Sequence, residues 1–289
     1  MAKLLFALAV VFATSAAAAT PQLSGRIVFS AGPLEPGRSN VYVYDLATNK
    51  VTQLTHDRGI HFDPTASPDG KHVAFRSRIG SEDYDIRVVS IRGTGLRNLT
   101  SNPAMDYAPA WSPDGRRIAF ASERGFRLPH VWVMNADGSN PHVLTRAFTG
   151  EYPAWSPDGK RIVFASNISV TNTGFELVVV NADGTNPHRV THNDVYDMGP
   201  DWSPDGKTIA FYSGRDTVGG GHHVYVMRRD GSGVRRLTRG AGELPSWSPD
   251  GRYLVYAAPS GLAVIRTDGS EVTRLRTKTG EPNFADWVR

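Results

Sequence analysis

The chain has 289 residues, no cysteine and a formal net charge of +4. The lack of cysteine excludes a disulfide framework and a cysteine-linked lipid anchor. Basic residues are scattered rather than grouped in runs, which argues against nucleic acid as a partner.

The first 19 residues have the pattern of a cleavable signal peptide. Lys3 precedes an apolar run from Leu4 to Ala13, and the small residues from Ala16 to Ala19 supply an Ala-x-Ala cleavage motif. The apolar run is much shorter than the roughly 20 residues of a membrane-spanning helix. We therefore expect residues 1–19 to be removed and residues 20–289 to form a single exported domain, periplasmic or secreted and not embedded in a membrane.

Three short segments with strand character follow in residues 26–55. They cover 26–30, 41–44 and 51–55, and they match the last three strands of the repeating unit found further along the chain. The N-terminal region is therefore expected to lack the first strand of its own unit.

The rest of the chain repeats with a period of about 45 residues. The tetrapeptide Ser-Pro-Asp-Gly begins at Ser67, Ser112, Ser156, Ser203 and Ser248. A hydrophobic residue followed by threonine recurs with the same period, at Thr55, Thr100, Thr145, Thr191 and Thr238. Two landmarks with one period predict a series of equivalent structural units.

Each unit is expected to contain four short strands. The first ends in Pro-x-Trp, and the Ser-Pro-Asp-Gly that follows is typical of a tight turn. The third strands are apolar at consecutive positions, as in 178–180 and 224–226, so both faces of each sheet must be covered. Sheets packed face to face around an axis satisfy this requirement, which predicts an all-β propeller. A β-helix is the main alternative, but its repeats are shorter.

The C-terminal residues 283–287 look like a first strand with no unit after it. Joined to residues 26–55, they complete one blade. We therefore predict a six-bladed β-propeller of four-stranded antiparallel blades, closed by the C-terminal strand in the N-terminal blade.

These motifs resemble a known family. The sequence Pro-Ala-Trp-Ser-Pro-Asp-Gly-Lys-Arg-Ile at 153–162, with Val-Val-Asn-Ala-Asp-Gly and a Val-Thr end, is similar to the WD-like repeat of the TolB propeller family of the Tol-Pal envelope system. The resemblance covers residues 25–289 and implies a metal or a partner peptide at the channel mouth. Members of the family carry a separate domain before the propeller, whereas in this sequence a strand is expected shortly after the predicted cleavage site, so we do not expect a role that rests on that domain.

The most conspicuous repeated residues are expected to be structural, because an active site needs a unique group of side chains. The turn aspartates are Asp69, Asp114, Asp158, Asp205 and Asp250, and the tryptophans expected between blades are Trp111, Trp155, Trp202, Trp247 and Trp287.

Acidic residues near the start of each innermost strand are the first candidate site. Six carboxylates around the channel rim would attract a cation or a basic segment of a partner. Calcium suits oxygen ligands from flexible loops, so calcium in the channel is the expected ion if one binds. The alternative is that they are solvated loop acids. The rim candidates are Asp63, Asp106, Glu151, Asp197, Glu243 and Glu281.

The loops between second and third strands differ most between units and should lie on the same face as the rim. Variable loops on a repeated scaffold usually carry specificity. Tyr84, Phe126 and Leu128 are the apolar side chains expected to contact a partner.

Histidines offer a different interpretation. His56, His61 and His192 could hold a metal in an enzyme. That alternative is a metal-dependent carbohydrate lyase or lactone hydrolase with its site in the channel.

The leading hypothesis is a monomeric, non-enzymatic binding module of the cell envelope. Its partner would be an envelope or extracellular protein, including one associated with peptidoglycan.

Overall fold

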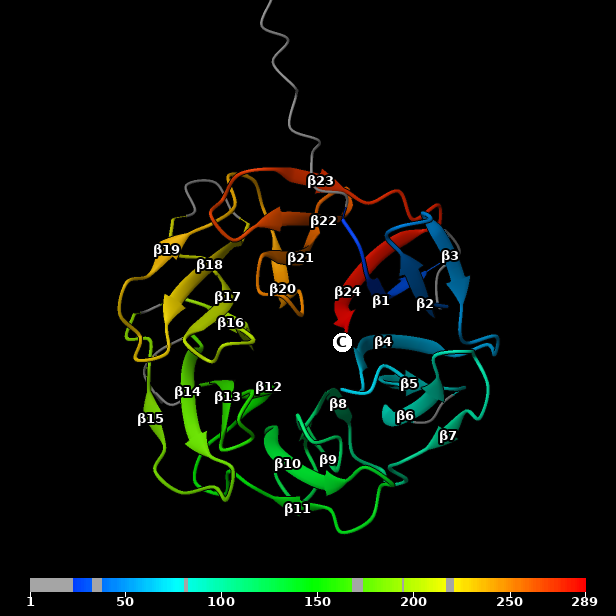
Figure 1. The fold of residues 1–289 in the computed structure, drawn as a ribbon. Helices are drawn as coiled ribbons and strands as arrows, with labels where there is room; N and C mark the ends of the chain where they lie inside the picture. The colour runs from blue at the N-terminus through cyan, green and yellow to red at the C-terminus, as the bar shows by residue number, and fades with distance from the viewer. Residues whose placement is uncertain (1–22, 33–37, 81–82, 168–173, 194, 217–220) are drawn as a thin grey trace, which may run out of the picture.

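The computed structural model describes residues 23–32, 38–80, 83–167, 174–193, 195–216 and 221–289. The predicted signal peptide, residues 1–19, lies outside them. The described residues form 24 strands in six four-stranded antiparallel sheets, arranged as blades around a central axis (Figure 1). No helix in this part of the chain is long and apolar enough to cross a membrane. The six-bladed propeller predicted from the repeat is confirmed.

Each blade contributes one strand to each of four concentric positions (Figure 1). The inner strands are β24 (Glu281–Val288), β4 (Ile60–Ala66), β8 (Asp106–Trp111), β12 (Glu151–Trp155), β16 (Asp197–Trp202) and β20 (Glu243–Trp247). The second strands are β1 (Arg26–Gly32), β5 (His72–Arg78), β9 (Arg117–Ser122), β13 (Arg161–Ser166), β17 (Thr208–Ser213) and β21 (Tyr253–Ala258). The third strands are β2 (Asn40–Asp45), β6 (Asp85–Ser90), β10 (His130–Asn135), β14 (Glu176–Asn181), β18 (His223–Arg228) and β22 (Gly261–Arg266). The outer strands are β3 (Lys50–Gln53), β7 (Arg97–Asn98), β11 (His142–Val143), β15 (His188–Arg189), β19 (Arg235–Arg236) and β23 (Val272–Arg274).

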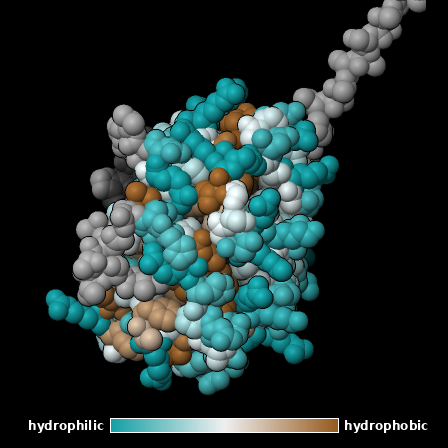
Figure 2. Space-filling model, turned by 90° about the vertical axis from the view of Figure 1, so that its left-hand side faces the viewer, coloured by the Kyte–Doolittle hydropathy of each residue, from teal (hydrophilic) through white to brown (hydrophobic). Residues whose placement is uncertain are grey.

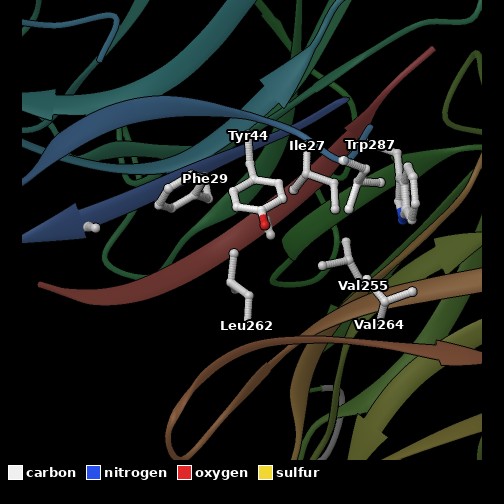
Figure 3. Close-up of a cluster of buried hydrophobic side chains, with 10 residues drawn as sticks. Ile27, Phe29, Tyr44, Val255, Leu262, Val264 and Trp287 are labelled. Carbon is white, nitrogen blue, oxygen red and sulfur yellow. The ribbon is translucent and has the colours of Figure 1, made fainter. Parts of the chain in front are cut away.

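The ring closes in the blade that joins the two ends of the chain. Strand β24 pairs with β1, and Trp287 stands opposite Ile27. Figure 3 shows these two residues in a buried cluster with Phe29 and Tyr44 of the same blade and with Val255, Leu262 and Val264 of the last blade. The predicted closure by the C-terminal strand is therefore confirmed.

The hydrophobic core is divided among the seams between neighbouring blades. Blades are numbered in chain order from the one that joins the two chain ends (blade 1, β24-β1-β2-β3) to the one that ends in β23 (blade 6). In the seam between blades 3 and 4, for example, Val131 and Val133 pack with Trp155 and Phe164. Trp155, Trp202, Trp247 and Trp287 are buried in such clusters, and Trp111 is partly buried. The outer wall in Figure 2 is mostly hydrophilic, with small hydrophobic areas between hydrophilic ones. The tryptophans thus have the interblade role expected from their recurrence.

The two repeated landmarks stabilise turns and connections. In the turn after β12, the Asp158 carboxylate accepts hydrogen bonds from the Ser156 hydroxyl at 2.6 Å and the Lys160 amide at 3.0 Å. Gly159 has a φ of 68°, in the left-handed region where a side chain is disfavoured. The hydroxyl of Thr145 is buried and accepts a hydrogen bond from the Val131 amide at the start of a third strand. The same threonine contact recurs for Thr55, Thr100, Thr191 and Thr238.

Candidate functional site

The two faces of the ring differ in what the connections present. The Ser-Pro-Asp-Gly turns lie on one face, which we call the turn face. The opposite face, the loop face, carries the connections from second to third strands and the starts of the inner strands. Ile60 at the start of β4 pairs with Arg78 at the end of β5, which places both on the loop face. The predicted rim and the predicted variable loops therefore share one face.

A narrow hollow of ≈ 140 Å³ follows the axis, lined by three consecutive residues from each of the six inner strands. Every inner strand has a register irregularity beside this hollow. The residue before the repeated proline, whose place is taken by Ala285 in β24, has a positive φ in each strand, which is the geometry of a β-bulge. These six equivalent residues are Asp63, Ala108, Tyr152, Gly199, Leu244 and Phe284, with φ values from 37° to 56°.

This ring of six bulges was not predicted from the sequence. A positive φ costs a non-glycine residue roughly 1–2 kcal/mol, and only Gly199 among the six avoids that cost. Backbone strain of this kind persists where the surrounding structure enforces it and is often found at functional sites. The six side chains differ in charge, size and polarity. The channel wall is therefore asymmetric although its backbone repeats.

On the loop-face side of the bulges, Arg76 is the centre of a polar and aromatic group. Its guanidinium carbon lies 5.0 Å from the ring centre of Phe62, 4.9 Å from that of Tyr84 and 5.8 Å from that of Tyr107. Its Nε lies 3.1 Å from Oδ2 of Asp63, and both side chains are largely buried. Cation–π contacts of this geometry contribute about 0.5–2 kcal/mol each. The arginine is thus held by one carboxylate and three rings.

Burial sets the protonation of the groups around this arginine. It raises the pKa of the Asp63 carboxyl, while the neighbouring Arg76 favours the charged form. Burial also raises the pKa of Glu151, opposed by the hydrogen bond from the Tyr107 hydroxyl. The phenols of Tyr107 and Tyr152 have pKa values raised above the ordinary range, mainly by burial. Both phenols are therefore neutral hydrogen-bond donors at physiological pH.

The six predicted rim acids are not equivalent, because they stand at four different positions relative to the bulge. Asp63 is at the bulge itself. Asp106 and Asp197 are two residues before it in their strands and are fully buried. Arg124 binds Asp106 at 2.5 Å and Arg215 binds Asp197 at 2.7 Å. These two carboxylates stabilise the blades and do not face the channel mouth as free charges.

The other three acids are at least partly open to solvent. Glu151 and Glu243 occupy the position directly before the bulge, and both are partly exposed. Glu243 lies 2.7 Å from Nδ1 of His222. Glu281 is exposed at the start of β24. Successive residues of a strand point to opposite faces of the sheet. Glu151 stands one residue before its bulge and Asp106 stands two residues before its own, so the two side chains point to opposite faces and only Asp106 is fully buried.

The three predicted partner-contact residues have different environments. The ring of Tyr84 lies against Arg76 and Arg78, each guanidinium 4.9 Å from its centre. Phe126 is partly buried, and its ring centre lies 3.9 Å from that of His130 with the two rings tilted by 34°. Leu128 is 57% exposed. Only Leu128 of the three presents most of its apolar surface to solvent.

The histidines proposed as metal ligands are not brought together. His61 is fully buried, with its ring nitrogens 2.9 Å from the Ser77 hydroxyl and 2.7 Å from the Asp57 carboxylate. His56 and His192 are exposed. Within the described ranges, no group of three or more His, Cys, Asp or Glu side chains is arranged to hold a metal ion. The described residues therefore do not assemble the ligand set named under the enzyme alternative, and a metal bound by His56, His61 or His192 stays an untested prediction.

Comparison with known proteins agrees with this geometry. Residues 20–152 and 147–285 match the family described as the TolB beta propeller domain, PD40. The Tol-Pal system protein TolB of Francisella tularensis is 36% identical over 85 residues, a match that covers 28% of this chain and 19% of that protein. The matched segment is thus a small part of the relative's length.

Solved structures resemble the fold over a longer stretch. TolB from Acinetobacter baumannii superposes with a TM-score of 0.81 at 23% identity, covering 92% of this chain and 67% of that chain. An oligogalacturonate lyase in complex with manganese gives a TM-score of 0.60 at 18% identity, covering 86% and 73% of the two chains. At these identities the likeness concerns the fold alone.

Proposed function

This chain belongs to the TolB beta-propeller family, and from that premise we propose that it is a non-enzymatic protein-binding module of the cell envelope. Its partner docks on the loop face, at the mouth of the central channel. The partner is an envelope or extracellular protein, and the module acts as a monomer in the periplasm or outside the cell after removal of residues 1–19.

The observation that carries this proposal is the asymmetry of the channel mouth. The turn face presents the same tetrapeptide five times, whereas the six equivalent bulge positions carry six different side chains. A repeated scaffold that differs at equivalent positions can recognise one partner in one orientation. Arg76, its three aromatic neighbours and Asp63 add a rigid polar group beside the bulges.

The charges at the mouth indicate the kind of partner segment that fits. Glu151 and Glu243 are partly exposed on the loop face, whereas Arg76 is largely buried against Asp63. A basic or polar segment would gain from the two carboxylates. Leu128 on the same face offers an exposed apolar contact at the rim. Calcium bound by the mouth carboxylates is a further possibility that calorimetry with Ca²⁺ tests directly.

The experiment is capture of crosslinked partners from an envelope extract, with the mature chain as bait. The variant Glu151→Lys/Glu243→Lys reverses the accessible mouth charges and should lose the captured protein. The matched control Asp137→Lys/Asp230→Lys reverses two exposed turn-face charges and should retain it. Asp197 is unsuitable for charge reversal, because it is buried against Arg215. Equal capture by both variants would refute docking at the mouth.

A further inference from the structure

Each second strand carries a buried aromatic residue at the same position, and five of the six lie against another planar group. Centre distances are 5.4 Å for Phe29 and Tyr42, 5.2 Å for Phe75 and His61, and 5.8 Å for Phe164 and Phe148. The Arg124 guanidinium lies 5.3 Å from the ring centre of Phe120, and that of Arg215 lies 5.2 Å from that of Phe211. The sixth residue, Tyr256, makes no ring-stacking or cation–π contact among the described residues, although Arg274 lies near enough to act electrostatically on its hydroxyl.

The missing partner has a local cause. In the seam between blades 3 and 4, Phe148 belongs to the connection 145–150 and stacks almost parallel on Phe164, at 3°. The corresponding connection between blades 5 and 6, residues 238–242, is one residue shorter and contains no aromatic side chain. The position opposite the second-strand ring is also smaller, because Val178 faces Phe164 but Ala263 faces Tyr256.

These two differences leave a groove of ≈ 620 Å³ along the seam between blades 5 and 6. Its apolar lining includes Leu237, Tyr256, Ala263 and Ile265. Val272 on the outer strand also lines it and is 54% exposed, so it extends the apolar lining to the surface. A volume of this size is in the range of sites that take up a bulky apolar group.

The charges around the groove are mainly positive. Residues 228–278 contain ten basic and five acidic side chains, a net charge of +5 in a chain whose total is +4. Arg239, Arg274 and Glu271 line the groove; Glu271 lies 3.9 Å from Arg266, whereas neither Arg239 nor Arg274 makes an ion pair with any residue in the described part of the chain. In the filled seam between blades 3 and 4, by contrast, the residue equivalent to Arg274 is Arg189, which binds Glu176 at 2.9 Å.

We propose that this groove binds an aromatic side chain presented by an acidic segment of a partner protein. The aromatic ring takes the place over Tyr256 that Phe148 takes over Phe164, and carboxylates beside it pair with Arg239 and Arg274. Because Arg239 and Arg274 are positively charged, they would repel an arginine side chain of the partner, so the planar group over Tyr256 is an aromatic ring and not a guanidinium. The site is separate from the channel mouth and stands whether or not the mouth binds a protein.

The test uses the mature chain and two labelled peptides, Asp-Glu-Phe-Glu-Asp and Asp-Glu-Ala-Glu-Asp, with binding followed by fluorescence anisotropy at low salt. We expect the Phe peptide to bind at least roughly tenfold more tightly, because only its ring is buried in the groove. Arg274→Gln should weaken binding of both peptides. Equal affinity for the two peptides would overturn the proposal.

A second variant tests the place of binding. Replacing residues 239–241 by Arg-Ala-Phe-Thr copies the connection that carries Phe148, so the chain would fill its own groove. This graft should abolish the preference for Phe and raise the melting temperature. If the graft does not fold, Ala263→Val narrows the groove with the residue found opposite Phe164 and should reduce the preference.

Three further results bear on the proposal. A folded graft that keeps the Phe preference would contradict it. Competition by free phenylpropionate at equal concentration would also contradict it, because the groove would then be a small-molecule site. Unchanged peptide binding by Glu151→Lys/Glu243→Lys is expected and separates this site from the channel mouth.

Discussion

Trp287 pairs with Ile27 across the strands that join the two ends of the chain. The tryptophan is 2% exposed and packs with residues of the first and last blades. The interface therefore closes the ring through backbone pairing and through apolar burial, without a covalent bond between the ends.

Removing this closure should destabilise the whole ring. Truncation of a buried tryptophan costs about 3–5 kcal/mol, so Trp287→Ala should lower the free energy of unfolding by that amount. Deletion of residues 282–289 should lower the melting temperature further, because β1 then becomes an open edge. Urea and thermal unfolding compare the two variants with the parent chain. Val272→Ala, at an exposed position, is the control. An unchanged midpoint for the deletion would show that closure does not depend on β24.

The carboxylate next to this tryptophan connects three blades. Asp286 Oδ2 accepts hydrogen bonds from the Ala66 amide at 2.9 Å and the Thr65 hydroxyl at 3.1 Å, and its Oδ1 accepts one from the Ser246 hydroxyl at 2.6 Å. Hydrogen bonds to charged groups contribute about 1.5–3 kcal/mol. Asp286→Ala should therefore cost about 3 kcal/mol in a urea titration, and Asp286→Asn should cost less because it keeps an acceptor. Equal losses for the two variants would indicate a packing effect.

The fold could be predicted from the sequence because its two landmarks repeat with one period and each has a local cause. Ser156, Asp158 and Gly159 form their turn from neighbouring residues alone. The unpaired strand-like segment at 283–287 likewise indicated closure, since an inner strand was missing from the N-terminal blade.

The candidate site was less predictable because it depends on contacts between distant residues. The bulge adds one residue to each inner strand, and the six acids stand at four different distances from it, so grouping them only by their place near the start of the strand mixed positions that face opposite sides of the sheet. Asp106 was expected at the rim, but Arg124, on the connection after the next strand, holds it inside the blade. The proline that opens each Pro-x-Trp motif directly follows the bulge residue, and aligning the strands on that proline, with Ala285 in its place in β24, separates the acids into four positions.

Substitutions at equivalent bulge positions should have opposite effects. Ala108 has a φ of 49°, so Ala108→Gly removes strain and should raise the free energy of unfolding by about 1 kcal/mol. Gly199 has a φ of 56°, and a Cβ there would lie 2.8 Å from the Tyr212 ring. Gly199→Ala should therefore cost about 2 kcal/mol from strain and crowding. Thermal and urea unfolding of the pair test this, and a change of the same sign in both would contradict a shared bulge geometry.

The buried ion pair of Asp106 and Arg124 should depend on both partners. Arg124→Ala leaves the fully buried carboxylate without its cation, which typically costs about 3–5 kcal/mol. The double variant Asp106→Asn/Arg124→Met removes both charges and should be closer to the parent in stability. Chemical denaturation of the two variants decides the point. A double variant that is less stable than Arg124→Ala would mean that the arginine acts mainly through its contact with Trp132, whose ring centre lies 5.0 Å away.

The contribution of Asp201 to stability should fall as the pH rises, whereas that of a carboxylate held by a cation falls as the pH is lowered. Burial raises its pKa to about 6; the nearby Arg289 opposes this shift, and the Asp286 carboxylate adds a smaller increase. Because this folded-state pKa lies above the ordinary aspartate value of 3.8, the contribution of Asp201 to stability is full below pH 4 and is lost as the pH rises through about 6. Asp201→Asn keeps an acceptor for the Trp247 amide, which now lies 2.9 Å from Asp201 Oδ2. The variant should therefore be similar to the parent at pH 4 and more stable at pH 7, by up to about 3 kcal/mol. Urea titrations at several pH values measure the difference, and a difference that shrinks as the pH rises would mean that Asp201 is ionised and favourably paired in the folded state.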